Sequence, residues 1–166
     1  MTDAERLIAQ IEEAFAGVTL DDGLSLNECE YADSGGTAKE FLERAKQDER
    51  HDWHKVINDE LTNYHVTFAF TDLKGYRFYL PAYMVWTIRN LGSTEIIGDF
   101  TIYACSPAKH QFRHTPFHQC FSRKQRLAIA AFLEYCAAAG SSMCDANVAR
   151  QNLRRIQDCR EASRGG

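Results

Sequence analysis

The hydrophobic residues of the chain change their period in the middle of the sequence. Apolar residues take every second position over residues 66–70 and again over residues 76–80, and the turn residues Leu73, Lys74 and Gly75 stand between the two runs. A period of two places successive side chains on opposite faces of a β-strand. The pattern therefore predicts an antiparallel hairpin over residues 66–80.

Two further segments favour extended structure. Phe100, Ile102 and Ala104 alternate with Thr101 and Tyr103, which predicts a third strand beside the hairpin. Near the N-terminus, the turn signal Asp22-Gly23 separates residues 18–20 from residues 24–26, and both short runs alternate. We expect a short hairpin or an extended loop there.

Three Ser/Thr-x-x-Glu/Gln capping boxes mark predicted helix starts. They begin at Thr2, Thr37 and Ser122, and predict helices ending at Gly17, at about Arg50 and at Gly140. Helical spacing over residues 51–64 fits either one kinked helix or two short ones, with Asn58 capping a fresh turn. Pro81 is expected at the first position of a short buried helix that reaches about Asn90. A weaker last helix is predicted over residues 145–158.

These elements predict an α+β fold with a small antiparallel sheet of about three strands packed with five to six helices. A chain of 166 residues is long enough to bury a hydrophobic core, so residues 1–166 are expected to form a single domain. Residues 141–166 are expected to add a peripheral C-terminal helix and a frayed tail.

The chain carries no sign of export or of membrane insertion. No apolar run approaches the roughly 18 residues that span a bilayer, and Asp3 and Glu5 stand where an export signal is basic. We expect a cytoplasmic protein with no membrane association. The six cysteines are then expected to be thiols packed as small hydrophobic residues.

Charge is distributed unevenly along the chain. Residues 1–66 hold 16 acids and 6 bases, a net of −10, whereas residues 67–166 hold 7 acids and 13 bases, a net of +6. Either the two parts attract each other within one fold, or one of them faces a charged partner.

Histidines at steps of four predict a candidate metal site. The proposed ligands are His110, His114, His118 and Cys120. Residues four apart share one face of a helix and can chelate zinc, but Pro116 disfavours a continuous helix here. The alternative is a solvated loop, and we predict no cofactor. Phosphate-binding loops, nucleophile elbows and His-Glu-x-x-His are absent from the sequence.

The aromatic run over residues 75–86 supplies a candidate partner-binding surface. In the predicted hairpin and helix, Arg77, Tyr79 and Tyr83 have the phase that leaves them free to face a groove. Nucleic-acid binding would instead use the arginines of the last helix and of residues 123–126, with Phe112, Phe117 and Phe121 nearby as stacking residues.

The motif Gly75-x-Arg77-Phe78-Tyr79-Leu80-Pro81-Ala82-Tyr83-Met84, preceded by Trp53-x-x-Val56-Ile57 and Glu60-Leu61, resembles a bacterial family of small domains of unknown function. The resemblance covers most of residues 5–135 and does not extend beyond Gly140. At Ile57-Asn58 the chain departs from the family's Ile-Pro-like step. The resemblance implies a bacterial, cytoplasmic, free-standing small protein and adds no activity.

Taken together, these features favour a non-enzymatic protein-binding domain of accessory or immunity type. A small Cys/His-dependent or metal-dependent enzyme, such as a hydrolase, is the first alternative. Nucleic-acid binding through the Arg-rich C-terminal region is the second, and a pI of about 5.9 disfavours it. Another protein is the expected partner, and the oligomeric state stays open.

Overall fold

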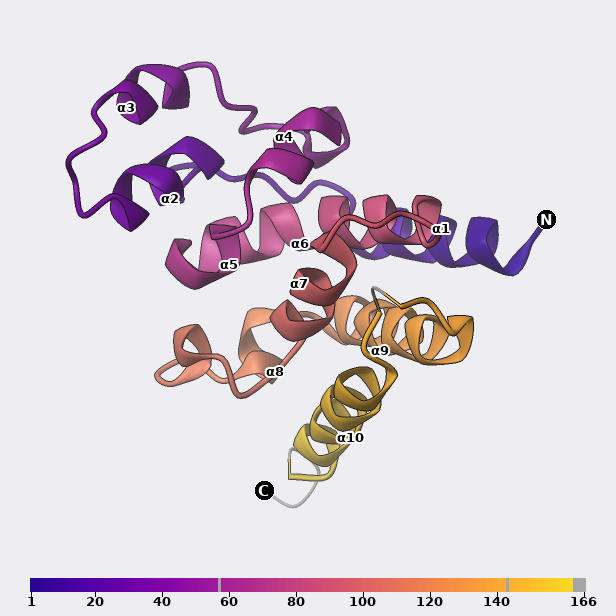
Figure 1. The fold of residues 1–166 in the computed structure, drawn as a ribbon. Coiled ribbons are helices and arrows are strands. Elements are labelled where there is room, and N and C mark those ends of the chain that lie inside the picture. The colour runs from indigo at the N-terminus through magenta and orange to yellow at the C-terminus, as the bar shows by residue number, and fades with distance from the viewer. Residues whose placement is uncertain (57, 143, 163–166) are drawn as a thin grey trace. The chain divides into compact units, whose positions relative to one another are not determined.

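The computed structural model describes residues 1–56, 58–142 and 144–162 and, within them, is entirely helical (Figure 1). Ten α-helices and two 3₁₀ helices occur in these residues, and no strand does. In chain order the elements are α1 (Asp3–Ala14), α2 (Leu26–Asp33), α3 (Glu40–Ala45), η1 (Trp53–Lys55), α4 (Asn58–Asn63), α5 (Thr67–Phe70), α6 (Leu73–Arg89), α7 (Ile97–Ala104), η2 (His110–Phe112), α8 (Phe117–Cys120), α9 (Arg123–Ala139) and α10 (Ala146–Ala162). The predicted α+β class is therefore wrong.

The three predicted strands all lie in helices. Residues 66–70 fall mainly in α5, residues 76–80 in α6, and residues 100–104 in α7. Only Lys74, Arg77 and Arg89 are exposed along α6. A helix that is buried on nearly every side lacks the polar face that reveals a helical period, so the alternation of residues 76–80 was misleading. Pro81 stands inside α6 and does not start it.

A capping box that the sequence analysis overlooked begins α2. The Ser25 side chain accepts from the amide of Glu28, and the Glu28 carboxylate accepts from the amide of Ser25 at 2.8 Å. Together these bonds satisfy two backbone donors at the start of the helix. The run predicted as the second arm of a hairpin is therefore a helix start.

The box predicted at Thr37 is not formed. The Thr37 hydroxyl donates to the carbonyl of Ser34, and α3 begins at Glu40 without a side-chain cap. This helix ends at Ala45, five residues before the predicted end at Arg50. A competing local bond of the threonine hydroxyl explains the difference.

Other predicted helices are confirmed, although the first ends at Ala14 and not at Gly17. The boxes of Thr2 with Glu5 and of Ser122 with Gln125 begin α1 and α9, and Gly140 ends α9 in the left-handed conformation at φ +64°. Residues 51–64 form two short elements, η1 and α4, and Ile57 lies outside the described residues. The last helix is present as α10.

Two compact units make up the chain, one of Met1–Ala16 with Tyr83–Gly166 and one of Gly17–Ala82. In the first unit, α9 packs against α1 and α10, and α10 also contacts α7 (Figure 1). Phe15, the C-cap residue of α1, meets Phe121 edge to face, with ring centroids 6.4 Å apart. Asn152 of α10 is fully buried and donates to the carbonyl of Ile102 at 2.9 Å.

In the unit Gly17–Ala82, α2 contacts α3 and α5. The Tyr79 hydroxyl accepts from the amide of Leu26, the first residue of α2, at 3.2 Å. The Asn27 side chain donates to the Asp48 carboxylate at 2.6 Å and accepts from the Tyr64 hydroxyl at 2.8 Å. These bonds to partners distant in sequence fix α2 within its unit.

Candidate functional site

An apolar groove lies between α1 and the last turn of α6, within the unit Met1–Ala16 with Tyr83–Gly166. Its volume is about 350 Å³. The lining residues are Ala4, Glu5, Ile8, Ala9, Glu12, Ile88 and Arg89. Apolar side chains form most of this lining, and charged groups stand at its margin.

The groove exists because the apolar stripe of α1 is wider than its core contact. Leu7, Ile11 and Phe15 are buried, whereas Ile8 is only partly buried. Ile8 follows Leu7 by about 100° around the helix axis, which turns it away from the core contact of Leu7, and it lines the groove with Ile88. This additional apolar residue next to Leu7 is the signal for the groove in the sequence.

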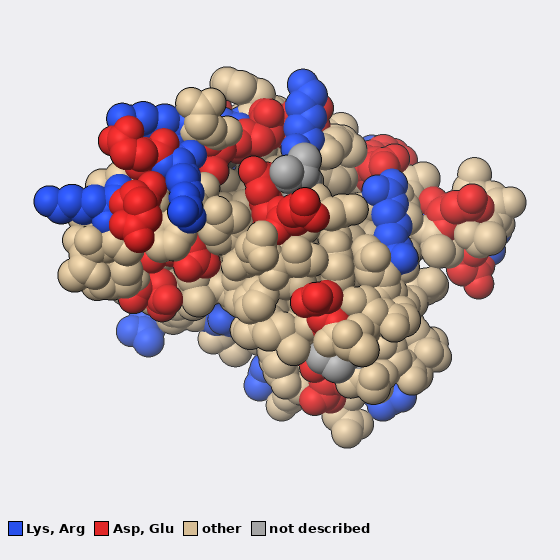
Figure 2. Space-filling model, turned by 45° about the horizontal axis from the view of Figure 1, so that its top comes forward, with Lys and Arg blue, Asp and Glu red and all other residues tan. Residues whose placement is uncertain are grey.

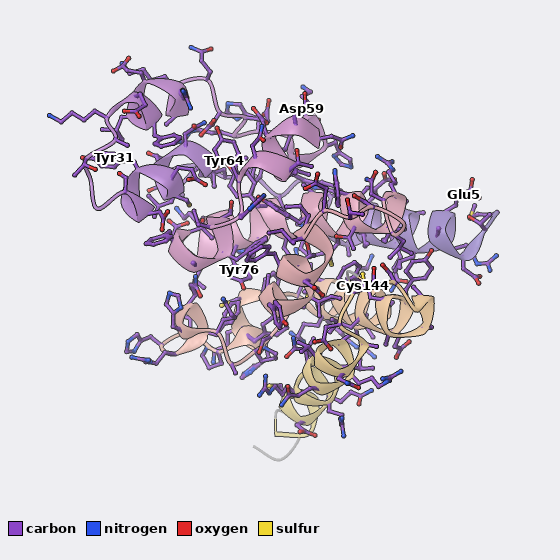
Figure 3. All side chains as sticks on the ribbon, in the orientation of Figure 1. Glu5, Tyr31, Asp59, Tyr64, Tyr76 and Cys144 are labelled. Atoms are coloured by element: carbon purple, nitrogen blue, oxygen red, sulfur yellow. The ribbon has the colours of Figure 1, made fainter. Side chains whose placement is uncertain are left out.

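The α1 side of the groove is acidic. Asp3–Ala14 holds four acids and one base. Glu5 (labelled in Figure 3) accepts from the amide and the hydroxyl of Thr2, and these hydrogen bonds hold the pKa of Glu5 below its ordinary value. Its carboxylate therefore stays ionised at neutral pH. Among the described residues, neither Glu12 nor Arg89 takes part in an ion pair.

The predicted partner-binding residues do not form a common surface. Tyr79 and Tyr83 are each only 1% exposed, and Arg77 alone of the three is exposed. The prediction that the two tyrosines lie at a surface was wrong. It assumed that Tyr79 stands in a strand and that Tyr83 stands in a separate helix starting at Pro81. In the single helix α6, both tyrosines belong to the interior.

The four predicted metal ligands lie in and around η2 and α8. His110 and His114 are exposed, His118 is partly buried, and Cys120 is buried with its thiol donating to the carbonyl of Thr115 at 3.2 Å. Within the part of the chain that the structure describes, no group of three or more His, Cys, Asp or Glu side chains is arranged to hold a metal ion. The proposed set is thus not preassembled in this structure.

The cysteines are thiols, and no disulfide joins any of the six in the described part of the chain. All except Cys159 are buried. Burial raises the pKa of Cys29 to about 12 and also raises the pKa of Cys105. The hydrogen bond between Cys136 and Cys144 (labelled in Figure 3) raises the pKa of Cys136 and lowers that of Cys144. A raised thiol pKa disfavours the thiolate form that acts as a nucleophile.

The residues considered for nucleic-acid stacking are in the core. Phe112, Phe117 and Phe121 are at most 5% exposed and pack on one another, with centroids 4.7 Å apart between Phe117 and Phe121. Nearby, Arg126 donates to the carbonyls of His118 and Phe121. These aromatic rings therefore cannot stack on bases.

Two exposed ion pairs connect the acidic and the basic parts of the sequence. Lys124 pairs with Glu13 at 2.8 Å, and Lys74 pairs with Asp22. Some of the acidic residues are therefore paired with basic residues of the same chain, although exposed ion pairs contribute little to the stability of the fold. Figure 2 shows acidic and basic side chains intermingled in the region of α2–α4.

No helix among the described residues combines the length and the apolarity that crossing a bilayer demands.

The chain matches a known protein family over most of its length. A family of unknown function (DUF6714) matches residues 3–155, which is most of the chain and includes much of α10. No curated protein and no solved structure matches the chain. The match runs past Gly140, where the resemblance seen in the sequence ended. The chain therefore belongs to this family of unknown function.

Proposed function

We propose that this protein is a non-enzymatic binding domain that recognises a basic amphipathic helix of another protein in the groove between α1 and α6. The observation that carries the proposal is that the partly exposed Ile8 lines one groove with Ile88 and with the acidic residues Glu5 and Glu12 of α1. Helix-in-groove recognition uses such an apolar floor with charged margins.

The acidic margin selects the class of partner. Glu5 and Glu12 line the α1 side of the groove, so basic residues that flank the apolar face of a partner helix would be attracted to this side of the groove. A helix with leucines three to four residues apart and lysines on either side of them has the required pattern.

The remaining expectations are part of the same proposal. We propose a bacterial, cytoplasmic protein of accessory or immunity type, in which Arg77 stays available as an exposed contact residue. The raised pKa values of Cys29 and Cys105 disfavour these two thiols as nucleophiles and in that respect support a binding protein over a cysteine-dependent enzyme.

The test is fluorescence anisotropy with a labelled amphipathic peptide of leucine and lysine. The comparison peptide replaces every lysine with glutamate. We expect the lysine peptide to bind at least tenfold more tightly, with an affinity that falls as salt screens the acidic residues. Equal binding of the two peptides would exclude the proposed charge selection.

A pair of variants locates the binding. Ile8→Arg places a cation in the groove and is expected to weaken the binding of the lysine peptide at least tenfold. Leu42→Arg is the control, because Leu42 is an aliphatic residue of α3, 38% accessible, that does not line the groove. If the two variants bind alike, the groove is not the site.

A further inference from the structure

A second pocket lies between α10 and the end of α7 with the segment that follows it, also in the unit Met1–Ala16 with Tyr83–Gly166. Its volume is about 400 Å³, and residues from both sides line it: Tyr103, Ser106 and Lys109 from one, and Val148, Asn152 and Arg155 from α10. Among the lining residues that the structure describes, the charged ones are Lys109 and Arg155. The pocket is therefore cationic.

Arg155 is held in place by neutral groups. Its Nη1 donates to Ser106 Oγ and to Asn152 Oδ1, each at 3.2 Å. Asn152 is fully buried and is fixed in turn by its bond to the carbonyl of Ile102. A guanidinium has five N–H donors, so this arrangement orients Arg155 while leaving donors for a ligand.

Lys109 is the second cation, and it is partly buried. Neither Lys109 nor Arg155 forms an ion pair with any carboxylate in the described ranges. Burial lowers the pKa of Lys109, since the ammonium loses hydration without gaining a counter-charge. An anion in the pocket would supply that charge.

An aromatic surface adjoins the two cations. Tyr103 is 45% exposed, and Val148 is partly buried beside the same pocket. Exposed aromatic rings of this kind stack on the planar bases of nucleotides. The pocket also falls within the range of roughly 300–1,000 Å³ typical of small-molecule sites, which is more space than a phosphate group requires.

We propose that this pocket binds a small phosphorylated aromatic ligand of the mononucleotide class. The phosphate lies between Lys109 and Arg155, and the planar ring stacks on Tyr103. The inference is independent of the α1–α6 groove, which none of these residues lines.

Isothermal titration calorimetry of the full chain tests the two halves of the ligand separately. The probes are adenosine monophosphate, adenosine, ribose 5-phosphate and inorganic phosphate. We expect adenosine monophosphate to bind at least tenfold more tightly than each of the others, because it alone supplies both the ring and the phosphate. No binding of adenosine monophosphate, or equally tight binding of adenosine, overturns the proposal. Equal or tighter binding of inorganic phosphate overturns the stacking half, leaving a simple anion site.

Variants assign the contacts. Lys109→Gln is expected to weaken the binding of adenosine monophosphate at least tenfold, and Lys109→Arg is expected to keep most of the affinity. Tyr103→Leu is expected to weaken the binding of adenosine monophosphate several-fold and to leave the binding of inorganic phosphate unchanged. Arg154→Gln is the matched control, because Arg154 is an exposed neighbour on α10 outside the pocket. Thermal melts establish that each variant is folded. A folded Lys109→Gln that binds within twofold of the wild type refutes the site.

Discussion

Helices α6 and α9 have the same length, seventeen residues, but are stabilised in different ways. Along α6 only Lys74, Arg77 and Arg89 are exposed. Along α9 one face is buried, and the other carries exposed residues such as Lys124 and Glu134. The first helix depends on burial around most of its circumference, and the second on one apolar stripe.

Their ends differ as well. A reciprocal box of Ser122 with Gln125 begins α9, and left-handed Gly140 ends it. At the start of α6, the Asp72 carboxylate accepts from the amide of Gly75 at 2.9 Å and from that of Leu24 at 3.2 Å. Asp72 thus caps the helix and also ties it to a distant segment. End signals that can be read locally mark α9, whereas α6 depends on tertiary contacts.

The variants with the largest expected effect on stability test whether residues on opposite faces of each helix are buried. Residues two apart lie about 200° apart around a helix axis. Phe78 and Leu80 of α6 are both fully buried, so Phe78→Ala and Leu80→Ala should each lower the free energy of unfolding by about 3–5 kcal/mol. The matching pair in α9 differs, because Phe132 is buried and Glu134 is exposed. There we expect about 3–5 kcal/mol for Phe132→Ala and under ~0.5 kcal/mol for Glu134→Ala.

Urea unfolding followed by circular dichroism measures all four variants. The comparison fails if Leu80→Ala is as mild as Glu134→Ala, because α6 would then have an exposed face as α9 does.

A glycine in each helix region provides a second test. A Cβ at Gly75 would stand 1.8 Å from Thr71 Oγ1 and 2.8 Å from the carbonyl oxygen of Leu24. The Thr71 hydroxyl donates to that same carbonyl. Gly75→Ala should therefore destabilise by about 1–3 kcal/mol through overpacking, although alanine normally stabilises a helix interior relative to glycine by about 1 kcal/mol.

Gly140→Ala is the matched substitution. Nothing lies within 4 Å of a Cβ at Gly140, and its φ is +64°. Only the left-handed backbone conformation opposes alanine there, by about 1 kcal/mol. Urea midpoints of the two variants measure the difference. A Gly75→Ala protein as stable as the wild type would show that Thr71 and Leu24 can move aside.

The contrast explains how much of the fold the sequence could predict. Capping boxes are read from residues three apart, so the starts of α1 and α9 were predicted from Thr2 and Ser122. Residues 76–80 carry no such signal, and a short apolar run fits a strand as well as a buried helix. Asp72 falls within the predicted hairpin, and its capping role could not be predicted because its bond to Leu24 depends on the tertiary fold.

The candidate sites were predicted less well for a related reason. Ile8 was recognised as apolar, but its partner Ile88 is eighty residues away in the sequence. Arg155 was noted as a polar residue of the last helix, whereas Lys109 had no motif to mark it. Both sites form where segments distant in sequence meet, so residue spacing alone could not assemble them.

The smallest effect concerns two helices that both begin with a serine box. In α2 the reciprocal acceptor is the carboxylate of Glu28, and in α9 it is the neutral amide of Gln125. Burial raises the pKa of Glu28, but hydrogen bonds from Ser25 and Arg50 outweigh burial and lower the pKa below its ordinary value. Arg50 also pairs with this carboxylate at 2.9 Å.

A lowered carboxyl pKa means that the folded state stabilises the ionised form of Glu28 more than the unfolded state does. The stabilisation by Glu28 is therefore complete above the ordinary glutamate pKa and disappears as the pH falls through the lowered folded-state value. Glu28→Gln converts the box of α2 to the type found in α9. We expect it to destabilise at neutral pH by about 0.5–1 kcal/mol, given the partial exposure of the ion pair, and to match the wild type in acid.

Glu30 on the same helix is the control, because its pKa is shifted in the opposite direction to that of Glu28. Burial and the neighbouring Asp33 raise the pKa of Glu30, so its ionised form opposes folding, and that cost is relieved as the pH falls through the raised value. Relative to the wild type, Glu30→Gln should raise the free energy of unfolding at neutral pH, and this difference should disappear in acid. Urea unfolding across the acid range compares the two variants. If both differences change in the same direction with pH, general charge and not the capping box governs the acid response of α2.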